Sequence, residues 1–324
     1  MRVCILGGGL SSLTLAKALV NQNIYVDLLI LKKSFKINKS RTIGISKSNI
    51  KYFNEHITPI DKIIWKLKKI EIYSDNLKNE KLLKFENNSD QLFSIIKNKN
   101  LIRLLEKNLS KNKYFKKKYF KKKNFLENYS LIINTDFSNP LTRKYFNKKI
   151  IKKYNSHAYT TIIKHEKILN NIATQIFTNK GPLAFLPISN NETSIVYSVN
   201  DYNSLNKEKI INLIKSHNFK YKIKKFENLD SFQLTSLNLR SYYNNNILAF
   251  GDLLHKLHPL AGQGFNMTLR DIKLLIRIIK NKIELGLPLD SSVNSEFEKK
   301  IKHKNYIFSD GINFIYEFFN FERK

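Results

Sequence analysis

A carboxylate and a group of glycines stand close together near the end of the chain, between positions 246 and 271. The apolar run Ile247–Phe250 is short and stops at Gly251, as a buried parallel strand does. Asp252 therefore follows directly on the carboxyl end of a predicted strand, which is where open α/β sheets bind ligands. A carboxylate at this place can accept hydrogen bonds from the hydroxyl groups of a ligand.

A tight loop and a helix follow this acid. Pro259, Gly262 and Gly264 predict a loop in which the backbone can approach a flat ligand closely. Apolar residues then return at helical spacing between Asn266 and Ile279, which predicts a helix. Because the first amides of a helix lack partners, its amino terminus attracts anions.

The beginning of the chain carries a second glycine loop. Val3–Leu6 reads as a strand, and the helix predicted after it runs from about Leu10 to position 19. Gly7 and Gly9 fill the first two positions of the dinucleotide fingerprint, and Ser12 stands at the third, where a small residue still permits close packing of the helix.

With both ends considered, the chain resembles the flavin-dependent aromatic hydroxylases of ubiquinone biosynthesis, within the p-hydroxybenzoate hydroxylase-like group. Their second flavin motif reads Gly-Asp-Ala-Ala-His and, a few residues later, Pro-x-Ala-Gly-Gln-Gly-x-Asn. Here it reads Gly251-Asp252-Leu253-Leu254-His255 and then Pro259-Leu260-Ala261-Gly262-Gln263-Gly264-Phe265-Asn266. Only the two small alanines differ, so the match is long and specific.

The resemblance implies an α/β fold, with a Rossmann-like FAD-binding domain and an interleaved β-sheet substrate domain. It also implies a shortened and divergent member of the group. The implied FAD-binding domain is discontinuous and covers 1–60, 90–150 and 246–290. The substrate domain covers 61–89 and 151–245, and 291–324 forms a carboxyl-terminal helical segment.

The resemblance also implies which residues hold FAD. Asp252 is expected to accept hydrogen bonds from the ribityl hydroxyls, and Arg41 to reach the pyrophosphate, for which a charged guanidinium fork is well suited. Arg103, on a helix predicted over 98–109, is a weaker candidate. The complete set of expected cofactor-binding residues is Gly7, Gly9, Leu10, Ser12, Arg41, Arg103, Asp136, Gly251, Asp252, Pro259, Ala261, Gly262, Gln263, Gly264 and Asn266.

The segment 173–187 resembles a signature of the same hydroxylases. In that group, the inner face of the substrate sheet lies over the flavin ring and forms the substrate pocket. Gln175, Phe177, Phe185 and Pro187 are therefore the expected pocket residues. Core packing is the alternative role for the two phenylalanines.

Three positions depart from the pattern of the group. Ile30 stands where dinucleotide sites usually have a carboxylate for the ribose, which weakens the adenosine half of the site. Phe137 replaces a glycine, and Pro140 replaces a serine, in the segment expected to meet both flavin and pyridine nucleotide. We expect these bulkier residues to slow the reduction of the flavin by NAD(P)H.

Composition further limits the class of protein to which the chain can belong. The 42% hydrophobic content indicates a folded globular protein, and no apolar run is long enough for a membrane span. Because the amino terminus is predicted to be a core strand, no secretory signal is expected. Cys4 is the single cysteine, which excludes an intrachain disulfide. No clustered Cys or acidic residues surround His255 and His258, so no metal site is expected.

The net charge of +31 comes mainly from lysine and not arginine, and no nucleic-acid motif is present, so nucleic acid is not an expected partner. A solvated lysine surface or attraction to an anionic membrane surface explains this charge. Residues 110–128, where lysines alternate with aromatic residues, are either a low-complexity connection, which we favour, or a segment that binds polyanions or membranes.

The function implied by the resemblance is FAD-dependent hydroxylation of the ring of a polyprenylated phenol in ubiquinone biosynthesis. NAD(P)H and O2 are the implied co-substrates, and a quinone-biosynthesis complex is a possible partner. The expected location is cytoplasmic, peripheral to the inner face of the membrane. Two alternatives remain: a non-catalytic scaffold of such a complex, or another flavin-dependent oxidoreductase such as a reductase or halogenase.

Overall fold

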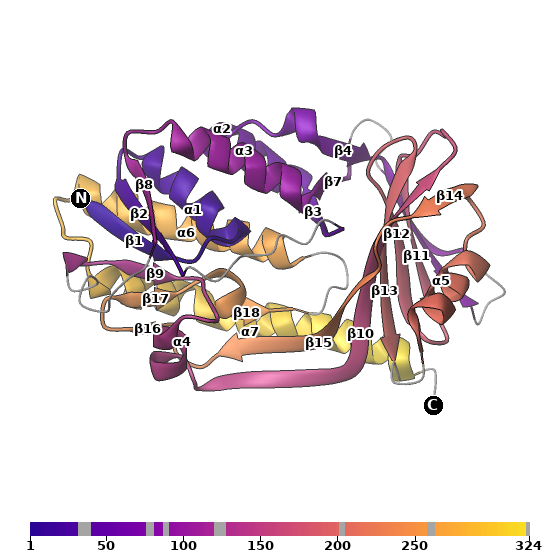
Figure 1. Ribbon diagram of the computed structural model, residues 1–324. Helices are drawn as coiled ribbons and strands as arrows, with labels where there is room; N and C mark the ends of the chain where they lie inside the picture. Colours follow the sequence, from indigo (N-terminus) through magenta and orange to yellow (C-terminus); the bar gives the residue numbers. More distant parts are fainter. Residues whose placement is uncertain are drawn as a thin grey trace.

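The computed structural model describes residues 1–31, 40–75, 81–86, 91–119, 128–200, 205–257 and 263–321. Two large sheets stand at opposite ends of the molecule, and long helices run between them (Figure 1). The helices are α1 (Leu10–Val20), α2 (Lys47–His56), α3 (Asn98–Ser110), α4 (Pro140–Tyr145), α5 (Lys207–Ser216), α6 (Gly264–Glu284) and α7 (Ser291–Phe321), with short 3-10 turns η1 (Asp61–Ile63) and η5 (Gly251–Leu253). None of the described helices has the length and apolarity needed to cross a bilayer.

The first sheet is mainly parallel. Its strands, in spatial order, are β16 (Tyr243–Asn244), β17 (Ile247–Ala249), β9 (Ile132–Asn134), β1 (Arg2–Leu6), β2 (Tyr25–Ile30) and β8 (Phe115–Tyr119). Only β16 pairs in the antiparallel sense. The inner strands β1 and β9 are apolar and buried along almost their whole length, as strands of parallel sheets usually are.

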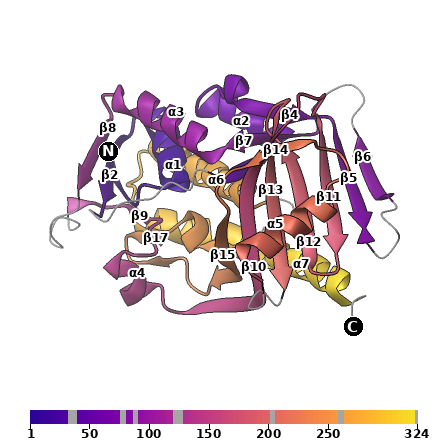
Figure 2. The ribbon, with the colours of Figure 1, turned by 45° about the vertical axis from the view of Figure 1, so that its right-hand side comes forward.

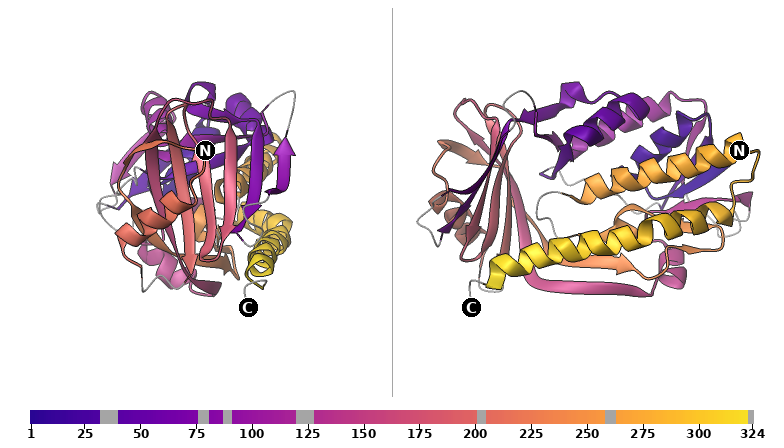
Figure 3. Two further views of the ribbon diagram at one scale, coloured as in Figure 1. Left: turned by 90° about the vertical axis from the view of Figure 1, so that its right-hand side faces the viewer. Right: turned by 180° about the vertical axis from the view of Figure 1, so that it is seen from behind.

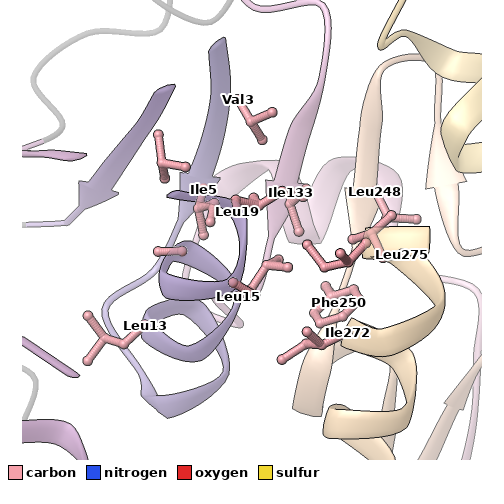
Figure 4. Close-up of a cluster of buried hydrophobic side chains, with 14 of the residues drawn as sticks. Val3, Ile5, Leu13, Leu15, Leu19, Ile133, Leu248, Phe250, Ile272 and Leu275 are labelled. Carbon is pink, nitrogen blue, oxygen red and sulfur yellow. The ribbon is translucent and has the colours of Figure 1, made fainter. Parts of the chain in front are cut away.

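The main core lies between this sheet and its helices. The side chains of β1, β9 and β17 interdigitate with those of α1 and α6, and Ile5, Leu15, Leu248 and Ile272 are among the residues that meet there (Figure 4). All four are fully buried. The predicted strand–glycine loop–helix unit at the amino terminus and the strand–loop–helix unit at 247–284 therefore pack on each other.

The second large sheet, nine-stranded in the described part of the chain, is mostly antiparallel. Its path is β18 (His255–Lys256), β15 (Asp230–Leu239), β10 (Lys149–His165), β13 (Glu192–Asn200), β12 (Gly181–Pro187), β11 (Ile172–Thr178), β5 (Lys69–Ser74) and β6 (Lys81–Glu86), and β14 (Ile223–Phe226) also pairs with β10. Helix α5 covers the face turned away from the first sheet (Figure 2). We call that the outer face, and the opposite one the inner face.

Two elements join the large sheets. A small antiparallel sheet, β3 (Thr42–Ser46), β7 (Phe93–Lys97) and β4 (Ile64–Leu67), packs between the first sheet's helices and the inner face of the second sheet. Helices α6 and α7 lie side by side, and α7 continues to the second sheet, as the view from behind shows (Figure 3).

One expectation about the lysine-rich segment is corrected. Residues 115–119 are not part of a plain connection but form β8, which pairs with β2 in parallel at the edge of the first sheet. The strand is held by Lys118, which donates to the buried carboxylate of Asp27 at 2.8 Å. Residues 120–127 of the same segment lie outside the described residues.

Candidate active site

Three parallel strands of the first sheet end side by side. In the paired register, Leu6 of β1 neighbours Asn134 of β9, which neighbours Ala249 of β17. The Thr135 amide donates to the Leu6 carbonyl at 2.9 Å, and the Phe250 amide donates to the Asn134 carbonyl at 2.8 Å, so both strand pairings continue by one residue. The loops that follow these strands carry three of the predicted cofactor motifs, so motifs from the beginning, middle and end of the chain meet at one edge of the sheet.

Gly7 opens the first loop, and the structure requires a glycine there. Its φ is +113°, and a Cβ at this position would lie 2.5 Å from Thr135 Oγ1 and 3.4 Å from Asp136 Cβ. The Ser12 hydroxyl bonds the Thr135 hydroxyl at 2.6 Å, which fixes α1 against the end of β9. The predicted residues Gly7, Ser12 and Asp136 are therefore neighbours.

Gly251 brings the third loop to the same place. Its φ is +64°, and a Cβ there would lie 2.8 Å from both Cβ and Oγ of Ser11, in the first turn of α1. The next residue, Asp252, is exposed. The carboxylate predicted to bind hydroxyl groups thus lies on the exposed side of a loop that touches the glycine-rich helix start.

Both helices of this corner begin without a side-chain cap. The N-cap of α1 is Gly9 and that of α6 is Gln263; neither makes a capping hydrogen bond, and no acidic residue stands in either first turn. A Cβ added to Gly264 would meet nothing within 4 Å, so packing within the described protein does not require a glycine there. Free helix amides beside open space are suited to an anionic, flat ligand.

Lys256 lies near both Asp252 and Arg41. Arg41 is exposed and lies between Ser40 and Thr42, whose hydroxyls bond side chains of the second sheet's strands β10, β15 and β13. Burial lowers the pKa of Lys256, Asp252 opposes that shift, and Arg41 adds to it. Lys256 is therefore close enough to both Asp252 and Arg41 to interact with each electrostatically.

Asn266 fixes the start of α6. Its carboxamide oxygen accepts hydrogen bonds from the Ser46 amide at 3.1 Å and the Asn49 side chain at 2.8 Å, and its nitrogen donates to the Gly44 carbonyl at 3.1 Å. The side chain is buried and satisfied by the protein. Asn266 thus positions the loop before α6 and is not free to bind a ligand through these atoms.

A buried hydrogen-bonded pair of side chains supports the same loop. His255 Nε2 lies 2.6 Å from Asp271 Oδ2, and these side chains are 1% and 0% exposed. Arg270 donates to the other carboxylate oxygen at 3.1 Å. Asp271 was not recognised from the sequence, although an acid on the apolar face of a predicted helix is a signal that a buried partner exists.

The strand register places the expected pocket residues on two opposite faces of the second sheet. Gln175 pairs with Ala184, and Phe177 pairs with Pro182, and these side chains point to the inner face. Phe185 and Pro187 alternate with them and point to the outer face, where Phe185 is 2% exposed and stacks on Tyr221 at 5.8 Å. Phe185 is therefore a core residue, and only Gln175 and Phe177 lie on the predicted pocket face.

Some of the remaining predicted residues lie outside the described part of the chain, and the others can be placed in the structure. Pro259, Ala261 and Gly262 lie outside the described residues. Arg103 is exposed on α3, and within the described part of the chain no hydrogen bond or ion pair ties it to the corner formed by the three loops. Leu10 is the first residue of α1 and is half-buried at the corner.

The departures at positions 30 and 140 have local physical explanations. A Cβ on Gly8 would lie 2.8 Å from Ile30 Cδ1, so this apolar side chain packs on the glycine loop itself. Pro140 is the first residue of α4, whose N-cap Asn139 accepts from the Leu141 amide. A proline at that helical position loses no hydrogen bond, because its amide would have no helical partner.

Comparison with solved structures identifies the fold. The fold is that of FAD-dependent aromatic monooxygenases: p-nitrophenol 4-monooxygenase PnpA of Pseudomonas putida superposes with a TM-score of 0.79 at 12% identity, over 99% of this chain and 89% of that one. PqsL of Pseudomonas aeruginosa, described as a probable FAD-dependent monooxygenase, gives a TM-score of 0.73 at 14% identity, over 96% and 93%.

Within that class, the chain is similar in sequence to hydroxylases of ubiquinone biosynthesis. It is 29% identical to the 3-demethoxyubiquinol 3-hydroxylase of Escherichia coli over 154 residues, 45% of this chain and 39% of that protein. It is 22% identical to a mitochondrial ubiquinone biosynthesis monooxygenase of Xenopus tropicalis over 233 residues, 59% of this chain and 50% of that protein. The matches thus span half or less of each relative's length, and no protein-family model matches the chain.

The resemblance found in the motifs is confirmed by these relatives, and so is the α/β fold class. The corner also fits the flavin dinucleotide that the fold implies. Two glycines have positive φ, two helix starts are uncapped, and an exposed carboxylate stands beside them. On the adenosine side, Ile30 stands where the fold usually supplies a carboxylate.

Proposed function

We propose that this protein is an FAD-dependent monooxygenase that hydroxylates the aromatic ring of a polyprenylated phenol in ubiquinone biosynthesis. The observation that carries the proposal is the meeting of the Gly7 loop, the Asp252 loop and the inner face of the second sheet around one corner. FAD, when bound, supplies the oxygen-transfer chemistry, and the protein supplies position, exclusion of water and electrostatics.

Each group of residues has a proposed task. The amides at the start of α1, with Arg41, hold the pyrophosphate, because both present hydrogen-bond donors to an anion. Asp252 accepts hydrogen bonds from the ribityl hydroxyls. The amides at the start of α6 face the ring system and stabilise negative charge on it. Gln175 and Phe177 contact the substrate from the inner face, and no side chain is assigned as an acid or base.

Replacement of Asp252 by alanine tests the cofactor site. The variant loses hydrogen bonds to a polyol, which corresponds to about 1–3 kcal/mol and a roughly five- to 150-fold rise in the dissociation constant for FAD. Flavin fluorescence titration of the apoprotein measures this. Asp310, an exposed acid on α7, provides the matched control in Asp310→Ala. Equal affinities of the wild type and Asp252→Ala would contradict the assignment.

NAD(P)H is the proposed electron donor, and Phe137 is proposed to slow its access. Its side chain is 44% exposed, next to the turn in which Asp136 accepts hydrogen bonds from Ser138. We expect Phe137→Gly to speed the bleaching of bound flavin by NAD(P)H in stopped-flow experiments. An unchanged rate, with fast reduction already in the wild type, would show that Phe137 presents no barrier.

The membrane surface is the proposed source of the substrate, and the protein is proposed to lie in the cytoplasm, peripheral to the inner face of the membrane. The net charge of +31 favours anionic lipid. We expect binding to vesicles with anionic headgroups to weaken as salt rises, because exposed charges are screened over about 8–10 Å at physiological ionic strength. Cosedimentation measures this, with neutral vesicles as the control. Binding that is indifferent to salt and lipid charge would contradict it.

A non-catalytic scaffold of a quinone-biosynthesis complex is the second candidate. The packing of Ile30 on Gly8, where a ribose-binding acid is usual, favours it. The flavin content of the purified protein separates the two proposals. A yellow protein with one FAD per chain supports the enzyme, whereas a colourless protein that stays empty after incubation with FAD supports the scaffold.

A further inference from the structure

The inner face of the second sheet carries a continuous row of side chains across neighbouring strands. Directly paired residues share a face of a sheet, so the register defines the row without ambiguity. From the middle of the sheet to its edge, the row consists of Val196, Ala184, Gln175, Ile72 and Leu83, and we call it the central row. It crosses four strand spacings of about 4.8 Å, roughly 19 Å in all.

On β11 and β13, the central row is more exposed than the residues beside it. On β11, Gln175 is half-exposed between Ala173 and Phe177, which are 4% and 6% exposed. On β13, Val196 is half-exposed between Ser194 and Ser198, which are 1% and 4% exposed. The row is therefore a strip that the rest of the protein leaves partly open.

Covering elements lie on both sides of this strip. On one side, Ala173 packs with Leu67 and Ile95 of the small sheet, and Thr42 bonds Ser194 at 2.8 Å. On the other side, Ala158 of β10 is fully buried in a cluster with residues of β10 and β15. Helix α7 reaches that side, where Asn313 accepts a hydrogen bond from a tyrosine of β10. The strip thus runs between the small sheet and α7.

The polarity of the strip changes along its length. Beyond Val196, the next paired residues are Thr160 and Asp230, and Ser40 bonds their side chains at 3.2 and 2.7 Å. Ser40 directly precedes Arg41, so this polar end adjoins the candidate flavin corner. At the other end, Leu83 is 50% exposed on β6, a sheet-edge strand all of whose residues are exposed.

We propose that the central row holds the apolar tail of the substrate, with the hydroxylated ring at the Thr160 end and the tail leaving the protein over β6. This inference rests on the proposed function. Its physical basis is that a polar end beside the cofactor corner continues into a partly exposed strip that leads outward and is apolar except for Gln175. A tail of several isoprene units laid on this strip would remove apolar surface of both partners from water.

Equilibrium binding of two ligands tests the proposal: one phenol with a long prenyl tail and the same phenol without it. The variants are Leu83→Lys, which places a charge at the outer end of the row, and Ala184→Phe, which fills its middle. We expect each to weaken binding of the tailed phenol about tenfold, which corresponds to keeping roughly two methylene groups of the tail out of contact with the protein, and to leave binding of the tail-less phenol unchanged.

Leu169→Lys is the matched control, because Leu169 is 80% exposed and lies away from the row, in the connection before β11. Thermal unfolding of every variant shows whether the fold is kept. Equal losses for both phenols, no loss for either, or no binding of the tailed phenol by the wild type would overturn the proposal. A loss of vesicle binding by Leu83→Lys, with unchanged affinity for the tailed phenol, would overturn it in favour of a lipid-docking edge.

The binding measurement needs no turnover, so it separates this inference from the proposed function. Selective weakening of the tailed phenol in a protein that hydroxylates nothing would refute the monooxygenase and leave the tail site standing. Hydroxylation of the tailed phenol with unchanged affinity in both variants would refute the tail site alone.

Discussion

Replacement of Gly7 by alanine is expected to weaken FAD binding by about a hundredfold or more. The φ of +113° is strained for any L side chain, at roughly 1–3 kcal/mol, and the new Cβ would overlap Thr135 Oγ1 at 2.5 Å. That hydroxyl cannot retreat freely, because it bonds Ser12 and the Leu6 carbonyl. The loop must therefore move, and the first amides of α1 move with it.

Flavin fluorescence titration measures this loss. Gly311→Ala is the matched control, because Gly311 lies within α7, has no positive φ, and has open space where its Cβ would stand. Alanine there should stabilise the helix by up to about 1 kcal/mol. Retention of FAD by Gly7→Ala at wild-type affinity would show that the Gly7 loop does not contact the cofactor.

Replacement of Asp271 by alanine is expected to lower the free energy of unfolding by about 3–5 kcal/mol. The carboxylate is fully buried, and the change would leave His255 Nε2 without its partner and Arg270 with its bond to Asn305 alone among the described residues. Urea unfolding followed by circular dichroism measures the effect. We expect Asp310→Ala, at an exposed position of the neighbouring helix, to change stability by no more than about 0.5 kcal/mol.

A double variant distinguishes the stability that the intact pair contributes from the cost of leaving one buried partner unpaired. Replacing His255 and Asp271 together by leucines removes both polar groups, so we expect it to recover much of the loss seen in Asp271→Ala. If Asp271→Ala costs less than about 1 kcal/mol, the pair does not anchor the loop before α6 in the way its burial indicates.

The elements next to the cofactor corner could be predicted from sequence because each is a local pattern. A short apolar run, a glycine and an amphipathic helix recur at both ends of the chain, and the structure has β1–α1 and β17–α6 there. Glycine loops after parallel strands must meet at one edge of a sheet. The convergence of Gly7, Asp136 and Gly251 follows from this rule.

The pocket face could not be predicted in the same way. In the segment 181–187, both alternating sets are apolar: Pro182, Ala184 and Leu186 on one face, and Leu183, Phe185 and Pro187 on the other. Hydrophobic alternation identifies a strand but not which of two buried faces meets the ligand. Only the position of α5 over Phe185 reveals that this residue belongs to the outer core.

The pairing of strands that are far apart in the sequence could not be predicted either. Strand β5 joins β11 in parallel although about a hundred residues separate them, and β7 lies between β3 and β4. Such pairings depend on the whole packed structure and not on local propensity. The same holds for Asp271, whose partner His255 lies in β18, shortly before its own helix.

The most direct test of the central claim is hydroxylation of a prenylated phenol by the FAD-loaded protein under dioxygen labelled with the heavy oxygen isotope. The monooxygenase proposal predicts a hydroxylated product whose new oxygen carries the label. A chemical or enzymatic reductant for the flavin must be present, so that slow reduction by NAD(P)H does not hide the reaction. A protein that binds FAD and receives electrons, yet forms no product or forms one with unlabelled oxygen, would contradict the account.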